Sequence, residues 1–132
     1  MGPITDEMRK MVEEQRVSYV ATANKDGKPN VSPKGSTKVL DERTLVFADL
    51  FSEKTRRNLL ENPQVAVTVA DAKKFQGYQF KGRAELIEKG PLFDAMVQEL
   101  RKLPMKLPDP KYLVKINVEE VYDLRPGAQG KC

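Results

Sequence analysis

Alternation between apolar and polar residues is the main pattern along this chain, and it falls into short, separate segments. The segment 64–70 places Val65, Val67 and Val69 on one side, which is typical of a half-buried strand. The segment 77–88 alternates over a longer run. Further strands are predicted over 17–24, 29–40, 44–48 and 111–118, with an extension of the last one over 121–124.

Turn residues and glycines indicate how these strands are connected. Asp26-Gly27 predicts a hairpin that joins 17–24 to 29–40. A turn at 41–43 leads to the next strand, so the first three strands are expected to form a meander. Gly82 lies inside the longest strand, where a glycine indicates a bend or a close approach of another backbone segment.

Three helices are expected between the strands: one over 5–15, one over 52–61, and one that begins at Gly90-Pro91. Thr5 and Ser52 have side chains suited to an N-cap, and Pro91 suits a first helical position. The predicted buried faces are Met8, Met11 and Val12 in the first helix, Leu59 and Leu60 in the second, and Phe93, Met96, Val97 and Leu100 in the third.

The order of these elements predicts a mainly β fold with peripheral helices. A doubly wound parallel sheet needs a helix between most strands, and this chain lacks them. We therefore expect one domain over 1–132, built as a small, Greek-key-like antiparallel barrel. The aromatic residues Tyr19, Phe47, Tyr78 and Phe80 alternate as core residues do.

Composition narrows the possible chemistry. The chain has 132 residues, a net charge of +4, one cysteine and no histidine. A Cys/His zinc site and a histidine-based catalytic triad are therefore excluded, and no tight Asp/Glu group suggests another metal. No apolar run approaches the roughly 20 residues of a membrane span, and no secretory signal is evident. A cytoplasmic protein without a membrane partner is the expectation.

The segment "NVSPKGSTKVL" is unusual for a strand because its middle offers almost nothing apolar to bury. It carries Ser32, Lys34, Gly35, Ser36 and Lys38 instead. One interpretation is a polar edge strand in water. The other is contact with a close-fitting anionic ligand, since a glycine lets a flat ligand press on the main chain.

The segment "FSEKTRRNLLENPQVAV" contains a second polar cluster at a predicted helix start. Lys54 and Thr55 fall in the first turn, where free backbone N–H groups and the helix dipole favour an anion. Arg56 or Arg57 could add charge. The alternative is a capped surface helix whose cations are solvated. Two such clusters in one small barrel favour a shared anionic ligand.

Three runs together resemble the pyridoxamine 5′-phosphate oxidase-related FMN-binding proteins, the split-barrel flavoproteins. They are "DGKPNVSPKGSTKVLDERTLVF", "EKTRRNLLENPQVAVTV" and "GYQFKGRAEL". The most specific elements are Lys54-Thr55, Asn58-Leu59 and Asn62-Pro63 ahead of an alternating strand, with Gly77, Lys81, Gly82 and Ala84 in support. The resemblance spans about 17–88.

The resemblance implies a homodimer that binds FMN in a cleft between its subunits. The FMN phosphate would be held by Lys54 and Thr55 with help from Ser32, Lys34 and Ser36, and the flavin ring would lie along Lys34-Gly35-Ser36. Asn58 matches the pattern but fits a helix-packing role equally well. Relatives also use the deazaflavin F420 or bind haem, and the absence of histidine speaks against a histidine-ligated haem.

The chain departs from the true oxidase because it lacks the C-terminal, arginine-containing segment that grips the vitamin substrate. A vitamin B6 oxidase is therefore not expected. Three functions stay open: an FMN-dependent oxidoreductase with a small-molecule substrate, an electron-transfer flavoprotein that meets a redox partner protein, and a small basic barrel that binds nucleic acid. The third is disfavoured because basic residues are not interleaved with stacking aromatics.

Overall fold

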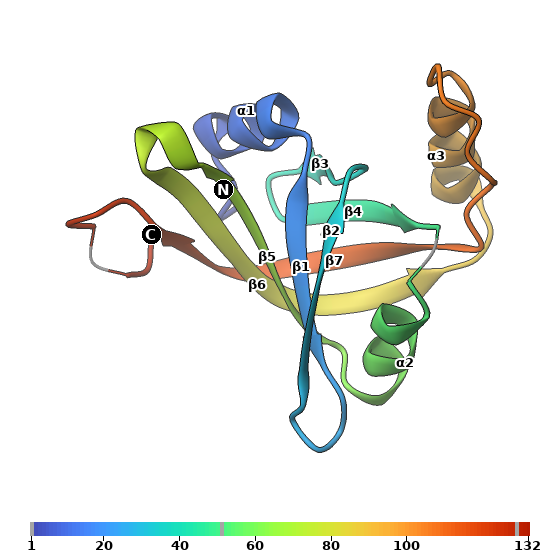
Figure 1. Ribbon diagram of the computed structural model, residues 1–132, viewed down its shortest axis with the longest axis horizontal. Coiled ribbons are helices and arrows are strands. Elements are labelled where there is room, and N and C mark those ends of the chain that lie inside the picture. The colour runs from blue at the N-terminus through green and yellow to red at the C-terminus, as the bar shows by residue number, and fades with distance from the viewer. Residues whose placement is uncertain (1, 51, 129) are drawn as a thin grey trace.

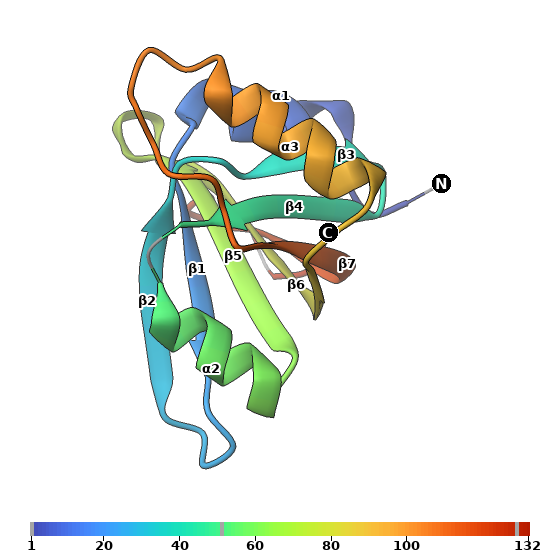
Figure 2. The same cartoon turned by 90° about the vertical axis from the view of Figure 1, so that its right-hand side faces the viewer.

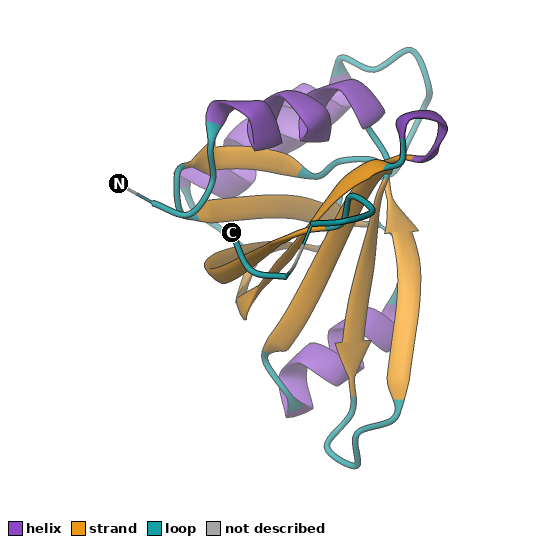
Figure 3. Ribbon diagram, turned by 90° about the vertical axis from the view of Figure 1, so that its left-hand side faces the viewer, coloured by secondary structure: helices purple, strands orange, loops and turns teal. Residues whose placement is uncertain are grey.

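A computed structural model describes residues 2–50, 52–128 and 130–132 of the chain (Figure 1). The described elements, in order, are α1 (Asp6–Gln15), β1 (Ser18–Ala23), β2 (Pro29–Lys34), β3 (Lys38–Asp41), β4 (Thr44–Asp49), α2 (Glu53–Glu61), β5 (Gln64–Asp71), the short 3₁₀ helix η1 (Ala72–Lys74), β6 (Gln76–Ile87), α3 (Pro91–Arg101) and β7 (Tyr112–Asp123). Helices lie at both ends of the curled sheet (Figure 3).

The strands form one antiparallel sheet in the order β2-β1-β5-β6-β7-β4-β3. Its two edge strands, β2 and β3, follow each other in the sequence and are joined by residues 35–37 alone. An extended chain covers at most about 14 Å between Lys34 and Lys38, so the two edges must meet at this end. The sheet therefore curls into a split barrel, as the sequence predicts.

The prediction of one continuous strand over 29–40, and of a three-strand meander, is wrong. β2 pairs with β1 and β3 pairs with β4, at opposite edges of the sheet. The break has a local cause, because 35–37 offers hydroxyls in place of apolar side chains. The Ser36 hydroxyl donates to the Ala48 carbonyl at 3.2 Å and accepts from the Ala48 N–H at 3.0 Å, which attaches the turn to β4.

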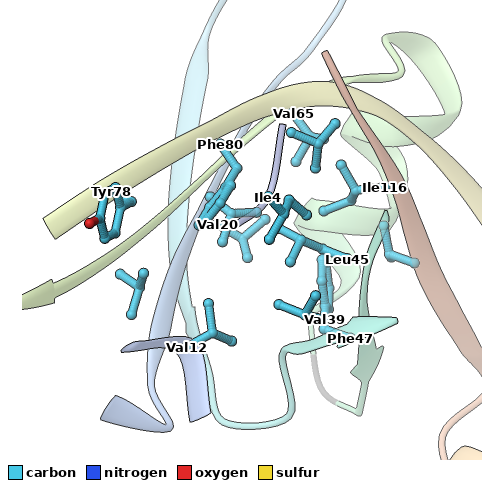
Figure 4. Packing of buried hydrophobic residues seen from close by; sticks show 14 of the residues in the cluster. Ile4, Val12, Val20, Val39, Leu45, Phe47, Val65, Tyr78, Phe80 and Ile116 are labelled. Carbon is cyan, nitrogen blue, oxygen red and sulfur yellow. The ribbon is translucent and has the colours of Figure 1, made fainter. Parts of the chain in front are cut away.

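The core lies inside the barrel, where strands from all parts of the chain contribute (Figure 4). Val65, Val67 and Val69 are buried as predicted, next to Phe80. α1 adds Met8 and Val12 to this core. Its predicted cap is also confirmed, because the Thr5 hydroxyl accepts the Met8 N–H.

Two apolar residues that the pattern assigns to the core are exposed. Leu60 is 60% exposed, whereas its neighbour Leu59 is buried. Tyr19 is 50% exposed, because it points to the outer face of β1. Local periodicity could assign neither position, because the adjacent Leu59 and Val20 are equally apolar. No helix within the described ranges is both long and apolar enough to cross a membrane.

Candidate functional site

A row of polar side chains runs along the inner face of β2. Asn30, Ser32 and Lys34 alternate with the exposed Val31 and Pro33. Because side chains in a strand alternate between faces, the three polar residues share one face and span about 13 Å. Figure 2 shows α2 beside β2, so this row lies between the strand and the helix.

A pocket of about 520 Å³ lies at the Lys34 end of this row, and we call it the β2 pocket. It falls within the range of about 300–1,000 Å³ that small-molecule sites occupy. One wall is polar and one is apolar. The lining residues are Ser32, Pro33, Lys34, Gly35, Ser36, Ala48, Leu50, Ser52, Leu100, Leu103, Met105 and Leu107.

Gly35 opens the main chain to the β2 pocket. A Cβ atom built on Gly35 would have no heavy-atom neighbour within 4 Å, so it would project into open space. The turn after β2 therefore presents bare backbone to the pocket. A flat ring can stack against such a surface without displacing a side chain.

A second pocket, of about 290 Å³, lies at the Asn30 end of the row, and we call it the α2 pocket. Lys28, Lys54 and Arg57 supply positive charge there, and Glu61 is the acid among its lining residues. Across the described parts of the chain, no ion pair engages Lys54 or Arg57. The α2 pocket is thus suited to an anion, since its cations are free to contact one.

Thr55 and Asn58 attach α2 to the sheet. Thr55 is fully buried, with its Oγ1 accepting from the Ser52 hydroxyl at 2.7 Å and lying 3.4 Å from Ser32 Oγ. Asn58 Nδ2 donates to Thr22 Oγ1 at 3.0 Å. Asn58 therefore makes a helix-packing contact and also lines the α2 pocket.

The structure brings the residues predicted from sequence into one region. Ser32, Lys34, Gly35 and Ser36 line the β2 pocket, Lys54 and Asn58 line the α2 pocket, and Thr55 lies against Ser32. Their role toward a ligand stays a prediction. Lys38 lies apart from them, because it pairs with Glu99 on α3 at 2.7 Å.

A buried polar cluster beneath Lys34 escaped the sequence analysis. Lys34 Nζ lies 3.1 Å from Asp49 Oδ1, and Tyr112 donates its hydroxyl to Asp49 Oδ2 at 2.6 Å. The Ser52 N–H donates to Asp49 Oδ1 at 2.9 Å. One signal existed in the sequence: an aspartate directly after the apolar run "LVFA" must be either the end of a strand or a buried carboxylate with partners.

The phenol of Tyr112 makes the free energy of unfolding depend on pH in the alkaline range. Burial and its hydrogen bond to Asp49 raise the pKa of Tyr112. The unfolded chain loses this proton near pH 10, whereas the folded protein keeps it, so stability falls as pH rises above about 10. We expect Tyr112→Phe to cost about 1–2 kcal/mol at pH 7 and to flatten the alkaline decline. Urea unfolding between neutral and alkaline pH tests this; parallel slopes for Tyr112→Phe and wild type would contradict it.

The apolar wall of the β2 pocket comes from the end of α3 and the loop after it, which carry Leu100, Leu103, Met105 and Leu107. This loop descends past the end of β4 before β7 begins (Figure 2). Its two ends are held together by Arg101, which donates to both carboxylate oxygens of Asp109 at 3.2 and 2.7 Å. The hydrogen bonds from Arg101 also lower the pKa of Asp109, so the carboxylate stays ionised to a lower pH than an isolated aspartate.

Comparison with known proteins gives consistent matches over nearly the whole chain. The chain is 42% identical over 126 residues to the uncharacterized protein MJ0282 of Methanocaldococcus jannaschii, covering 94% of this chain and 83% of that protein. A crystal structure of HupZ from Group A Streptococcus shares 29% identity, with a TM-score of 0.86 over 96% of this chain and 98% of that one.

A putative pyridoxamine 5′-phosphate oxidase from Lactobacillus delbrueckii shares 27% identity, with a TM-score of 0.76 over 92% of this chain and 95% of that one. Among more distant structures, an FMN-binding protein from Syntrophomonas wolfei and an F420 reductase, at 16% and 18% identity, share the fold. The family model described as pyridoxamine 5′-phosphate oxidase matches residues 4–125. This chain therefore belongs to the pyridoxamine 5′-phosphate oxidase family.

Proposed function

We propose that this protein binds FMN and acts as an oxidoreductase on a small substrate. The observation that carries the proposal is the continuous polar row of Asn30, Ser32 and Lys34, which joins a cationic pocket to a pocket with bare main chain. A phosphate-bearing flat ring needs both ends at once. In this arrangement the phosphate occupies the α2 pocket and the ring lies along Lys34-Gly35-Ser36.

The chain's own residues supply binding and shielding. Lys28, Lys54 and Arg57 attract the phosphate, and charge-assisted hydrogen bonds of this type are the strong ones in proteins. The leucines of the α3 loop keep water from the ring. Bound FMN would supply the hydride or electron chemistry itself, which suits a site without an evident acid–base pair. The β2 pocket has a volume of about 520 Å³, which supports a substrate-binding enzyme over a pure electron carrier.

We further propose that two copies of the chain pair through the outer face of β1 and β2. Val17, Tyr19 and Val31 are 43%, 50% and 62% exposed there, and Val31 lies opposite Ala21 in the β1–β2 ladder. An apolar patch of this kind on a sheet surface indicates a binding partner. Because β2 is an edge strand of the sheet, a second copy on this face would lie close to the strand that carries the polar row. That the protein works in the cytoplasm stays a prediction.

The deazaflavin F420 is the second candidate, because it also combines a flat ring with a phosphate. Titration of purified protein with each cofactor separates the two. Binding of FMN with quenched flavin fluorescence supports the proposal, whereas binding of F420 alone would replace FMN in it. Anaerobic reduction by NADH or NADPH then distinguishes an enzyme from an electron carrier, since fast turnover favours the enzyme.

Gly35→Leu tests the placement of the ring. The new side chain would enter open space, so we expect little change in the free energy of unfolding. It would occupy the surface on which the ring lies, so FMN affinity should fall at least tenfold, or about 1.4 kcal/mol. FMN titration and urea unfolding of the same variant measure the two effects. Unchanged FMN affinity would place the ring elsewhere.

A further inference from the structure

We infer that Asp49 is a positioning residue that cancels the charge of Lys34 and so keeps the ring end of the site electrically neutral. The inference rests on the proposed function, because its consequence is a low reduction potential for bound FMN. Asp49 lines neither pocket, so its carboxylate acts on the site through the paired side chain of Lys34.

The carboxylate of Asp49 is surrounded by donors from three elements. Its Oδ1 accepts from Lys34 Nζ at 3.1 Å and from the Ser52 N–H at 2.9 Å, and its Oδ2 accepts from Tyr112 at 2.6 Å. Lys34 belongs to β2, Ser52 caps α2, and Tyr112 begins β7. Asp49 thus joins the strand and the helix that carry the two halves of the candidate site.

The Lys34–Asp49 pair is shielded from water. The side chain of Lys34 is 9% exposed and that of Asp49 is 1% exposed. Lys34 Nζ also lies 5.7 Å from the centre of the Phe47 ring, inside the barrel. A buried ammonium is costly unless it is paired, so Asp49 makes this position of Lys34 possible. The two opposite charges lie close together, so they neutralise each other without screening by solvent.

The two pockets consequently differ in charge. The α2 pocket has three cations and one acid among its lining residues. Within the described lining of the β2 pocket, Lys34 is the one charged side chain, and its charge is cancelled by Asp49 behind it. The opposite wall is formed by leucines and Met105. The site therefore attracts an anion at one end and offers a neutral surface at the other.

This difference has a consequence for redox behaviour. When FMN takes up two electrons and one proton, its ring system gains one negative charge. A free ammonium beside the ring would stabilise the reduced form and raise the reduction potential. A Lys34 that is paired with Asp49 contributes a hydrogen-bond donor without net charge, so the potential stays lower. Without Asp49, the positive charge of Lys34 would predict a higher reduction potential.

The test measures the reduction potential of bound FMN in four proteins. Asp49→Asn keeps the shape and one acceptor oxygen but removes the carboxylate charge, so the Lys34 ammonium faces the β2 pocket uncompensated and reduced FMN should bind about tenfold more tightly relative to oxidised FMN. For a two-electron couple that change is about +30 mV. Lys34→Gln should shift the potential in the negative direction, because Asp49 is left unpaired. The double variant Lys34→Gln/Asp49→Asn has neither charge and should return near the wild-type value.

Tyr112→Phe is the matched control for a purely structural role. It removes a hydrogen bond from the same carboxylate without changing any charge. Its potential should stay close to wild type even if its stability falls. Thermal unfolding of each variant shows which are folded. If Asp49→Asn does not fold, the negative shift of Lys34→Gln and the recovery in the double variant still decide the question.

The outcomes separate the inference from the proposed function. FMN binding with the same potential in all four proteins overturns the inference and leaves the proposed function intact. Equal shifts of the reduction potential in Asp49→Asn and Tyr112→Phe would show that Asp49 has a purely structural role, which also overturns the inference. Failure of the wild-type protein to bind FMN overturns the proposed function, and the inference falls with it.

Discussion

Lys54→Ala is expected to weaken FMN binding roughly thirtyfold, because it removes a charge-assisted hydrogen bond worth about 2 kcal/mol. Lys54 lines the α2 pocket, where the phosphate is proposed to lie. It forms no ion pair with another described residue, so its charge is available to the phosphate. The affinity is measured by titrating apoprotein with FMN and following flavin fluorescence. Raising the salt concentration should narrow the difference in FMN affinity between Lys54→Ala and wild type, since part of the attraction between Lys54 and the phosphate is electrostatic.

The matched control for Lys54→Ala is Lys73→Ala. Lys73 lies on η1, away from both pockets, and has the same charge and an exposed position. Removing it changes the net charge of the protein by the same amount, so it reports any non-specific effect of charge. Equal FMN affinities for the two variants would show that Lys54 does not hold the phosphate. A loss confined to Lys54→Ala locates the anionic end of the ligand at the start of α2.

Gly82→Ala is expected to reduce the free energy of unfolding by about 3 kcal/mol, as overpacking of a closed interior does. Gly82 lies in β6 at the point where its register with β7 shifts between Lys81 and Gly82. A Cβ atom there would overlap the backbone carbonyl of Asn117 and press on Val118. Because the obstructing atoms are backbone, no rotation of a side chain can relieve the contact.

Gly35→Ala is the control for Gly82→Ala, because the same methyl group at Gly35 meets no neighbour. Urea unfolding should leave Gly35→Ala within about 0.5 kcal/mol of wild type, in line with surface substitutions. A stability loss for Gly82→Ala no larger than that of Gly35→Ala would contradict the close approach of β6 and β7. The comparison also checks the register shift between β6 and β7, since the close approach lies at that irregularity.

Local patterns in the sequence were enough to locate most of the elements. The Thr5 and Ser52 caps begin α1 and α2, and the valines at every second position of 64–70 define the inner face of β5. Gly82 marked the close approach between strands. These features depend on residues near one another in the chain, so hydrogen bonding, side-chain periodicity and steric limits decide them locally.

The candidate site could be predicted only in part. Lys54 and the polar residues of β2 stood out, because hydroxyls and lysines are rarely buried unless they have polar partners. The apolar wall did not, because Leu103, Met105 and Leu107 lie in a proline-rich loop without periodicity. Their place beside β2 depends on the length of α3 and on the Arg101–Asp109 pair.

Local patterns specify most of the strands and helices and show which of them carry cations and hydroxyls. Two features emerge only in the folded chain: 29–40 divides between opposite edges of the sheet, and Asp49 meets Tyr112, 63 positions further along the chain. The reason is physical: a strand's partners and a buried charge's counter-charge are chosen by closure of the whole barrel, which brings together residues that no local pattern relates.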